Sequence, residues 1–413
     1  MNRDDALALD AADGLASCRA RFELPDGLIY LDGNSLGPTP RATAGSVADV
    51  VRQAWGKGLV RSWNSADWMQ LPRLCGDAIG RLIGAGPGQV VAADSTSVNL
   101  FKVLSAAIDA SAGGFEIVSE RDNFPTDLYI AQGLCAQLGG SHRVVLLDTV
   151  DLDTVRAALT PETAVLLLTH VNYRTGVQLD MKRLTDLAHE AGVLVVWDLA
   201  HSAGAVPLSV DACGVDFAVG CGYKYLNGGP GAPGFLYVAE RHQATFRQPL
   251  TGWMGHAAPF AFETEYRPAP DLGRALSGTP SVLALTALQS GLETFDGVDL
   301  DALRKKSTDL TSLFIARAIE LCAGHGVELV TPMAAPARGS QVCLRHYEAY
   351  AVMQALIARD VIGDFRLPDI MRFGFAPLYV RYVDAYDAAT ILLEVLERRE
   401  WDRPEYRRRS AVT

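Results

Sequence analysis

The chain has 413 residues, of which 49% are hydrophobic, and it carries a formal net charge of −11 at pH 7. A chain of this length is too long for a single small core and suits a large domain joined to a smaller one. The acidic balance argues against a nucleic-acid partner, because binding phosphates requires a basic face.

The first segment, residues 1–40, is predicted to form an N-terminal helix and arm. It begins with the polar run Asn2-Arg3-Asp4-Asp5 and contains no long apolar stretch, so we expect no signal peptide and no membrane span. Residues 41–270 are predicted to form a large α/β domain with a mostly parallel sheet flanked by helices. Residues 271–413 are predicted to form a long helix followed by a smaller α+β domain.

A phosphate-binding site is predicted where a helix begins in the large domain. The run 94–99, Asp-Ser-Thr-Ser-Val-Asn, precedes a helix-like stretch over 100–110. Thr96 and Ser97 supply hydroxyls there, and a helix N-terminus favours an anion through its unpaired N–H donors and its dipole. The alternative is an ordinary Ser/Thr helix cap with nothing bound.

A strand, a helix and a second strand follow. Residues 164–170 and 193–198 are continuous apolar runs, and 180–191 has helical periodicity. Continuous apolarity is typical of parallel strands that are covered on both faces. The second strand ends at Asp198, which could alternatively cap the next helix, and the two roles are not expected to be filled together.

Lys224 ends the next strand-like run, residues 217–225. At the end of a buried strand the amine is partly desolvated, which lowers its pKa and favours Schiff-base formation. The alternative is a lysine that points into water. Because ligands of open parallel sheets gather at the carboxyl ends of strands, Asp198 and Lys224 are expected to face one pocket. A Schiff-base lysine with a carboxylate that keeps a pyridine nitrogen protonated indicates pyridoxal 5'-phosphate.

The pattern G-x-G-x-x-G over residues 229–234 does not indicate a dinucleotide site. Two prolines occupy its spacers and an extended run, residues 235–238, follows where a helix is required. We predict a turn that leads into a strand. Further on, strands are predicted over 327–330 and 340–344 and helices over 349–359 and 384–398, and the basic run 407–409 is predicted to be a solvated tail.

The seven cysteines include no C-x-x-C pair. We therefore expect no disulfide framework, no metal site and a reducing, cytoplasmic setting. Cys221 lies three positions before Lys224, where a nucleophile would be conceivable. It is predicted to pack in the strand as a small hydrophobic residue, because free cysteine is usually buried.

Six segments together resemble the kynureninase family, whose members are pyridoxal-phosphate enzymes with the aspartate-aminotransferase fold. These segments are residues 30–37 (YLDGNSLG), 123–127 (NFPTD), 198–204 (DLAHSAG), 222–227 (GYKYLN), 252–256 (GWMGH) and 371–379 (MRFGFAPLY). They occur in the family's order along nearly the whole chain, which is more specific than any one motif.

The resemblance implies a cofactor role for each matching position. Lys224 would form the internal aldimine and then shuttle protons, Asp198 would pair with the pyridine nitrogen, and Phe124 would stack on the ring. The family builds its site across a homodimer interface, which would add Trp253 and Thr279 from a second subunit. The rest of the implied cofactor shell is Thr96, Ser97, Pro125, Thr126, Asp127, Thr169, His201 and Tyr223.

The resemblance also implies substrate-binding residues. Arg372 would grip the α-carboxylate, a task that suits its planar fork of donors and permanent charge; the alternative, a surface ion pair, is disfavoured by its apolar neighbours. The implied aryl pocket contains Trp63, Asn64 and His256, although Trp63 and Trp68 could equally be packing anchors. A tryptophan there, without an extra polar group, favours kynurenine over 3-hydroxykynurenine.

The reaction of the family is hydrolytic cleavage of the Cβ–Cγ bond of L-kynurenine to anthranilate and L-alanine, a step of tryptophan degradation. The gem-diol formed by water at Cγ must lose a proton and Cβ must gain one, so a nearby phenol is a suitable acid–base group if cationic neighbours lower its pKa. Tyr223 is the predicted residue.

Two other functions are compatible with a pyridoxal-phosphate lysine. Cysteine desulfurases and class V aminotransferases share the fold, but a desulfurase requires a mobile cysteine and usually has a histidine before the lysine, where this chain has Tyr223. A non-catalytic regulator that binds the cofactor would usually carry a basic helix-turn-helix segment, and we find no region with that charge balance.

Overall fold

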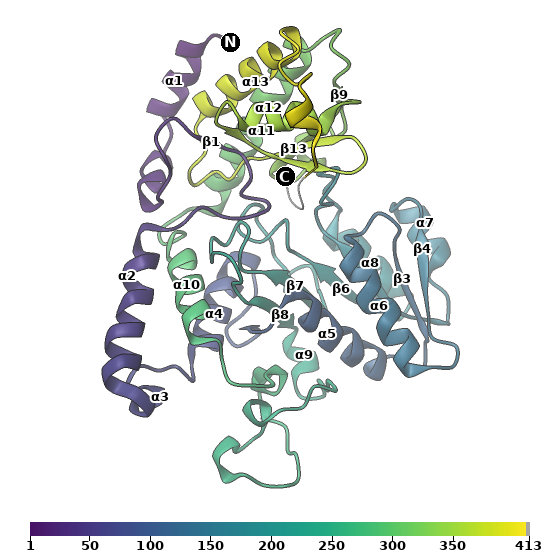
Figure 1. The fold of residues 1–413 in the computed structure, drawn as a ribbon. Helices are drawn as coiled ribbons and strands as arrows, with labels where there is room; N and C mark the ends of the chain where they lie inside the picture. Colours follow the sequence, from purple (N-terminus) through teal and green to yellow (C-terminus); the bar gives the residue numbers. More distant parts are fainter. Residues whose placement is uncertain (410–413) are drawn as a thin grey trace.

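The computed structural model describes residues 1–409, and a seven-stranded sheet lies at the centre of its lower part (Figure 1). The strand β8 runs antiparallel to both of its neighbours, and the other pairs are parallel. In order across the sheet, the strands are β2 (Val90–Ala92), β8 (Gly234–Val238), β7 (Phe217–Cys221), β6 (Leu194–Asp198), β5 (Thr163–Thr169), β3 (Glu116–Glu120) and β4 (Arg143–Leu147).

Both faces of this sheet are covered by apolar cores. In β6, Val195 and Trp197 enter one core and Val196 enters the other, because successive side chains of a strand point to opposite faces. The core around Val196 is completed by α5 (Thr96–Ala110) and α6 (Pro125–Leu138); the opposite core is completed by α4 (Leu71–Ile83), α8 (Met181–Glu190) and α10 (Val282–Glu293). The α/β class with a mostly parallel sheet is therefore confirmed.

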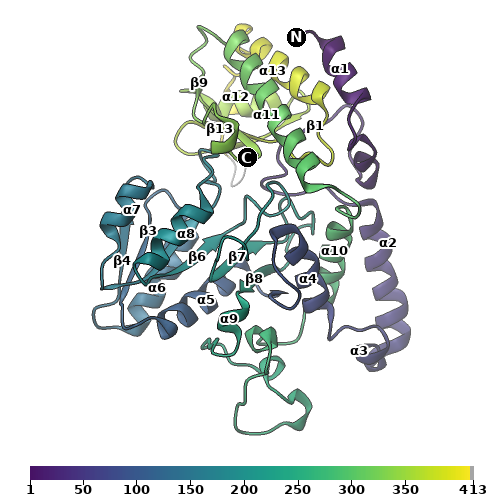
Figure 2. The same ribbon diagram turned by 180° about the vertical axis from the view of Figure 1, so that it is seen from behind.

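A second, four-stranded antiparallel sheet lies in the upper part of Figure 1. In order, its strands are β12 (Asp364–Arg366), β13 (Ile370–Gly374), β10 (Gln341–Arg345) and β9 (Glu328–Leu329), and the helices around it are α11 (Leu300–Leu321), α12 (Ala349–Ile357) and α13 (Tyr382–Glu397). The start of the chain joins this part: α1 (Arg3–Ala11) lies beside α13 (Figures 1 and 2), and β1 (Ile29–Tyr30) pairs with β11 (Val361–Ile362).

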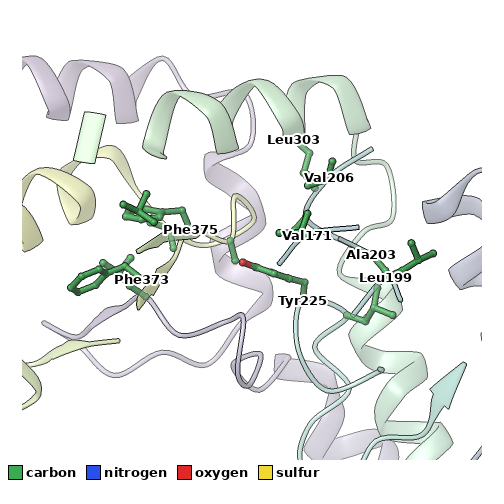
Figure 3. Close-up of a cluster of buried hydrophobic side chains, with 14 of the residues drawn as sticks. Val171, Leu199, Ala203, Val206, Tyr225, Leu303, Phe373 and Phe375 are labelled. Atoms are coloured by element: carbon green, nitrogen blue, oxygen red, sulfur yellow. The ribbon is translucent and has the colours of Figure 1, made fainter. Parts of the chain in front are cut away.

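One apolar core continues from the large sheet into the small one (Figure 3). Tyr225 lies between Leu199 on one side and Phe373 on the other. Its hydroxyl donates a hydrogen bond to the carbonyl of Ser340 at 3.2 Å. The segment that carries Lys224 is therefore packed between the two sheets.

Several boundaries differ from those expected. Because α5 begins at Thr96 rather than near residue 100, Thr96 and Ser97 form its first turn. Lys224 lies in the turn after β7 rather than inside the strand. The turn over 229–234 leads into β8, as predicted.

The run 407–409 is not wholly a solvated tail. The Tyr350 hydroxyl donates to the carbonyl of Arg408 at 2.9 Å, and the Arg409 guanidinium lies 5.5 Å from the ring centroid of Phe365.

No helix within residues 1–409 is long and apolar enough to span a bilayer. The remaining helices are η1 (Ala16–Arg21), α2 (Arg41–Asp49), η2 (Val50–Gly58), η3 (Leu59–Arg61), α3 (Ser62–Ser65), α7 (Leu152–Ala158), α9 (Glu240–Gln243), η4 (Trp253–Gly255), η5 (Pro259–Ala261), η6 (Leu272–Ala275), η7 (Ala335–Ala337) and η8 (Pro404–Arg407).

Candidate active site

Three of the predicted site residues lie at the carboxyl ends of adjacent parallel strands. Thr169 ends β5 and is paired in register with Asp198, which ends β6, and Lys224 follows β7. Thr169 and Asp198 are buried, whereas Lys224 is half-buried. This edge is where open parallel sheets bind their ligands.

The Lys224 amine is held by a histidine. Its Nζ lies 3.0 Å from Nε2 of His201. Burial, and then the positive charges of Lys224 and Arg372, keep the pKa of His201 well below its ordinary value. The imidazole is therefore neutral at pH 7 and can accept a hydrogen bond from the lysine.

Two carboxyl groups are buried beside the lysine. Asp127, in the first turn of α6, is fully buried, and neither of its oxygens has a hydrogen-bond partner among residues 1–409. Burial, and then the charge of Asp198, hold the pKa of Asp127 well above its ordinary value. Burial also raises the pKa of Asp198, and the Lys224 ammonium opposes this rise. Among residues 1–409, Lys224 is the cation that acts on both carboxyl groups.

Asp198 does not cap a helix, because a turn follows it. Its Oδ1 accepts the N–H of Ala200 at 2.7 Å. One oxygen therefore fixes the turn while the carboxylate still faces the site. The alternative of a helix cap is therefore not observed, and cofactor binding by Asp198 stays a prediction.

The N-termini of α5 and α6 lie close together, with 3.4 Å between the hydroxyl oxygens of Ser97 and Thr126. Helix α5 is capped by Ser95, whereas α6 begins at Pro125 after Phe124 and has no side-chain cap. Pro125 has no N–H and the Asp127 N–H donates to the Phe124 carbonyl at 2.9 Å, which leaves the N–H of Thr126 for an anion. Thr96 contributes differently, because its hydroxyl donates to the Gly220 carbonyl at 3.1 Å.

Aromatic rings surround the lysine amine. The ring centroids of Phe124 and Tyr223 each lie 5.8 Å from Lys224 Nζ. Burial, and then Cys221, raise the pKa of the Tyr223 phenol, and the cation of Arg366 opposes this only weakly. The condition that cationic neighbours lower this pKa is therefore not met in this structure. The phenol is neutral at pH 7 and can donate a proton.

Arg372 is buried in an ion pair with Asp364 rather than lying at the surface. Its Nε donates to Asp364 Oδ1 at 2.8 Å and its Nη2 contacts the second oxygen. The same Nη2 donates to the Ser35 hydroxyl at 2.8 Å, and Nη1 donates to the Tyr173 carbonyl at 2.7 Å. Strand pairing explains the contact, since Asp364 of β12 lies opposite Arg372 of β13.

Sequence reasoning missed several residues around this arginine. Asp32 and Ser35 belong to the segment 30–37, which the resemblance to the family includes. The signal for the others is weak, because nothing local distinguishes a buried polar residue on a short strand. The residues missed are Asp364, Arg366 and Gln341.

Five predicted residues have no contact with Lys224 among residues 1–409. Trp63 on α3 packs edge to face on buried Trp68 at 5.2 Å, which fits the packing alternative. His256 accepts from the Ala258 N–H at 3.0 Å, and its other ring nitrogen lies 3.2 Å from the Glu265 carbonyl. The others, Asn64, Trp253 and Thr279, lie at exposed positions of the chain.

The residues present fit pyridoxal phosphate. Lys224 offers an amine, and the buried carboxyl groups of Asp127 and Asp198 offer acceptor oxygens for a pyridinium. The start of α6 offers the N–H of Thr126 for a phosphate. The fold and this site define a pyridoxal-phosphate-dependent enzyme of the aspartate-aminotransferase fold.

Comparisons agree on the fold. The cysteine desulfurase CsdA of Escherichia coli superimposes with a TM-score of 0.78 at 20% identity, over 93% of this chain and 98% of that chain. A C-DES mutant with glycine covalently linked to its PLP cofactor gives 0.78 at 19% identity, over 92% and 98%. At such identities the likeness concerns the fold alone.

Sequence relatives define the family. The kynureninase of Burkholderia pseudomallei (strain 1106a) is 51% identical, over 100% of this chain and 99% of the relative, and that of Pseudomonas fluorescens is 49% identical over the same shares. The family model for the kynureninase C-terminal domain matches residues 303–392, and that for the DegT/DnrJ/EryC1/StrS aminotransferase family matches 144–214. The chain belongs to the kynureninase family and is a pyridoxal-phosphate-dependent hydrolase.

Proposed function

We propose that the enzyme hydrolyses L-kynurenine between Cβ and Cγ, giving anthranilate and L-alanine, as a step of tryptophan degradation. The main support is the identity of 51% with a kynureninase over the whole chain. L-Kynurenine is the proposed substrate and 3-hydroxykynurenine a weaker one. The seven free cysteines are consistent with a reducing, cytoplasmic location.

When bound, pyridoxal phosphate supplies an electron sink for negative charge beside the substrate α-carbon. In this proposal Asp198, supported by Asp127, holds the proton of the pyridine nitrogen, and Phe124 covers the ring. Ser97 and Thr126 bind the phosphate together with the first-turn N–H groups of α5 and the N–H of Thr126, and Thr96, Pro125, Thr169 and His201 complete the shell.

Proton transfer is assigned to two neighbouring side chains. The amine of Lys224 would take the α-proton of the substrate. After water has added to the Cγ carbonyl, the hydroxyl of Tyr223 would donate a proton to Cβ as the bond to Cγ breaks and would recover one from the gem-diol, so that the products are a carboxylic acid and the alanine fragment and the phenol is restored. The position of Tyr223 supports this role, because its ring centroid lies 5.8 Å from Lys224 Nζ.

We further propose a homodimer in which each subunit completes its partner's site. Trp253 is 42% exposed and packs on Phe260, and Phe262 beside it is 77% exposed. The segment that carries these residues projects at the bottom of the ribbon in Figure 1. Exposed aromatic residues gathered in one segment are typical of an interface. The aryl pocket of Trp63, Asn64 and His256, and the cofactor contacts of Trp253 and Thr279, would form across it.

A desulfurase is the second candidate, because solved desulfurases share the fold. That reaction requires an accessible thiolate near the lysine. Cys221 is buried, and burial raises the pKa of its thiol. It therefore packs as a small hydrophobic residue, as expected, and its position does not favour this function.

Turnover separates the two candidates. Cofactor-loaded protein incubated with L-kynurenine should produce anthranilate fluorescence and an equal amount of alanine, and incubation with L-cysteine should release little sulfide. The Tyr223→Phe variant should keep the cofactor absorbance and turn over about 10²–10⁴-fold more slowly. Absence of anthranilate from loaded wild-type enzyme would refute the proposed function, and an unchanged rate in the variant would refute the role of Tyr223.

A further inference from the structure

Two arginines share one buried carboxylate beside the site. Arg372 binds both oxygens of Asp364, and Nη2 of Arg366 donates to Oδ2 at 2.6 Å. Both arginines also contact the hydroxyl of Ser35, at 2.8 Å and 3.2 Å. This arginine pair, Arg366 and Arg372, therefore forms one cluster with Asp364 and Ser35.

Arg372 is occupied by the protein. Of the five N–H groups of a guanidinium, four are engaged: Nε with Asp364, Nη1 once with the Tyr173 carbonyl, and Nη2 with Asp364 and Ser35. The side chain is buried. An incoming carboxylate could therefore form at most one new hydrogen bond to it without breaking an existing one.

Arg366 is differently placed. Its side chain is 34% exposed, and only its Nη2 contacts Asp364 and Ser35. Its Nε is buried and has no hydrogen-bond partner among residues 1–409. A buried donor without a partner carries a desolvation penalty of about 1–3 kcal/mol, which a carboxylate bound there would relieve.

The charge balance of the cluster also leaves room for one anion. Two guanidiniums and one ionised carboxylate give a net charge of 2 − 1 = +1, because arginine stays protonated. Burial, and then the charge of Asp364, raise the pKa of Asp32 to about 8, so Asp32 is mostly neutral at pH 7. The cluster borders the site through Arg372, since its Nη1 donates to the carbonyl of Tyr173 and the ring of Tyr173 packs edge to face on Phe124 at 5.1 Å. Arg366 adds positive charge to the surroundings of Tyr223 and His201.

We propose that Arg366 is a direct ligand of the substrate α-carboxylate, and that Arg372 is its second donor, held in place by Asp364 and Ser35. The inference rests on the proposed function only in taking an α-amino acid as substrate. It adds a specificity residue that lies six positions before Arg372 and on the neighbouring strand.

The experiment compares Arg366→Gln with wild type on L-kynurenine and on its decarboxylated amine. We expect KM for L-kynurenine to rise about 10- to 100-fold, the loss of hydrogen bonds between charged groups, while kcat/KM for the amine changes less than twofold. Arg345→Gln is the matched control, because Arg345 lies on β10 of the same sheet, two strands from Arg366, and within residues 1–409 its ion pairs are with Glu328 and Asp369 alone. This variant should change the kinetics of neither substrate. Equal effects on both substrates, or none, would overturn the inference.

Binding measurements keep this test separate from the proposed reaction. If wild-type enzyme does not cleave L-kynurenine, calorimetric binding of L-alanine and of ethylamine to the cofactor-loaded proteins replaces kinetics. Arg366→Gln should weaken the binding of L-alanine and leave the binding of ethylamine unchanged. Cofactor absorbance and thermal unfolding of Arg366→Gln and Arg366→Lys show whether the variants are folded and loaded with cofactor. If a folded variant loses affinity for L-alanine and ethylamine equally, the role of Arg366 is refuted.

Discussion

Gln341 of the small sheet determines which ring nitrogen of His201 carries the proton. Its Oε1 lies 3.1 Å from His201 Nδ1, and its Nε2 donates to the carbonyls of Asn172 at 3.0 Å and Tyr173 at 3.1 Å. Because both amide hydrogens are used, the oxygen must accept from Nδ1–H. The lone pair of Nε2 then faces the Lys224 amine, so a residue of the small sheet orients the lysine of the large one.

This arrangement predicts a fixed tautomer. In ¹⁵N NMR spectra of the cofactor-free protein, His201 should be protonated at Nδ1. Gln341→Glu keeps an acceptor and should keep that tautomer, whereas Gln341→Leu should give a mixture and weaken cofactor binding roughly 2- to 10-fold, the worth of one hydrogen bond. A wild-type His201 protonated at Nε2 would refute the assignment.

The cluster around Arg372 predicts a pH dependence of substrate affinity. Asp32 faces the charged groups Asp364, Arg366 and Arg372 and the phenols of Tyr30, Tyr225 and Tyr379. Burial raises the pKa of each of these phenols, so they stay neutral. Ionisation of Asp32 above its pKa of about 8 therefore cancels the spare positive charge of the cluster.

We expect KM for L-kynurenine to rise on the order of tenfold between pH 7 and about pH 9.5, the effect of one charge at close range. Asp32→Asn should remove this rise while keeping the KM measured at pH 7. The variant also controls for titration of the substrate amine, which is common to both proteins. A parallel rise in the variant would show that Asp32 is not the titrating group.

The buried carboxyl pair predicts how the stability of the cofactor-free protein depends on pH. The folded-state pKa values of Asp127 and Asp198 lie above those of the unfolded chain. Above about pH 4, the folded protein therefore binds more protons than the unfolded chain does at the same pH. Its free energy of unfolding therefore falls with rising pH until both groups have ionised. Asp127→Asn should flatten this fall and raise the unfolding temperature at pH 8 more than at pH 5, measured by calorimetry without cofactor. An equal increase at both pH values would contradict the coupling.

The contrast between His201 and Gln341 shows what could be predicted from the sequence. The positions of Asp198 at the end of β6 and of Lys224 shortly after β7 could be predicted, because each follows a continuous apolar run and the geometry of parallel sheets brings such strand ends to one edge. Gln341 lies 140 positions from His201, and their contact depends on how two sheets pack. No local pattern encodes such a contact. Tyr223 shows the same limit, since burial rather than its sequence neighbours dominates its pKa.

The turn before α5 is held by a buried ion pair that should be sensitive to mutation in an asymmetric way. Lys102 is fully buried, and its Nζ donates to Asp94 Oδ2 at 2.6 Å and to the Ala275 carbonyl at 2.7 Å. Asp94 has a φ of 51° and its side chain is one-third exposed. Removing the aspartate therefore strands a buried ammonium, whereas removing the lysine leaves a carboxylate that water can reach.

We expect Asp94→Asn, which tolerates the left-handed conformation, to lower the free energy of unfolding by about 3–5 kcal/mol, the usual result of leaving a buried charge unpaired. Lys102→Met should cost less, and the double variant should lose less than the sum of the two single losses. Urea unfolding of the cofactor-free proteins measures all three. Lys305→Met, which breaks the exposed pair with Asp309, should change stability little. Strictly additive losses of unfolding free energy at positions 94 and 102 would contradict this interpretation. The ion pair would then not stabilise the turn before α5, on which the proposed phosphate site depends.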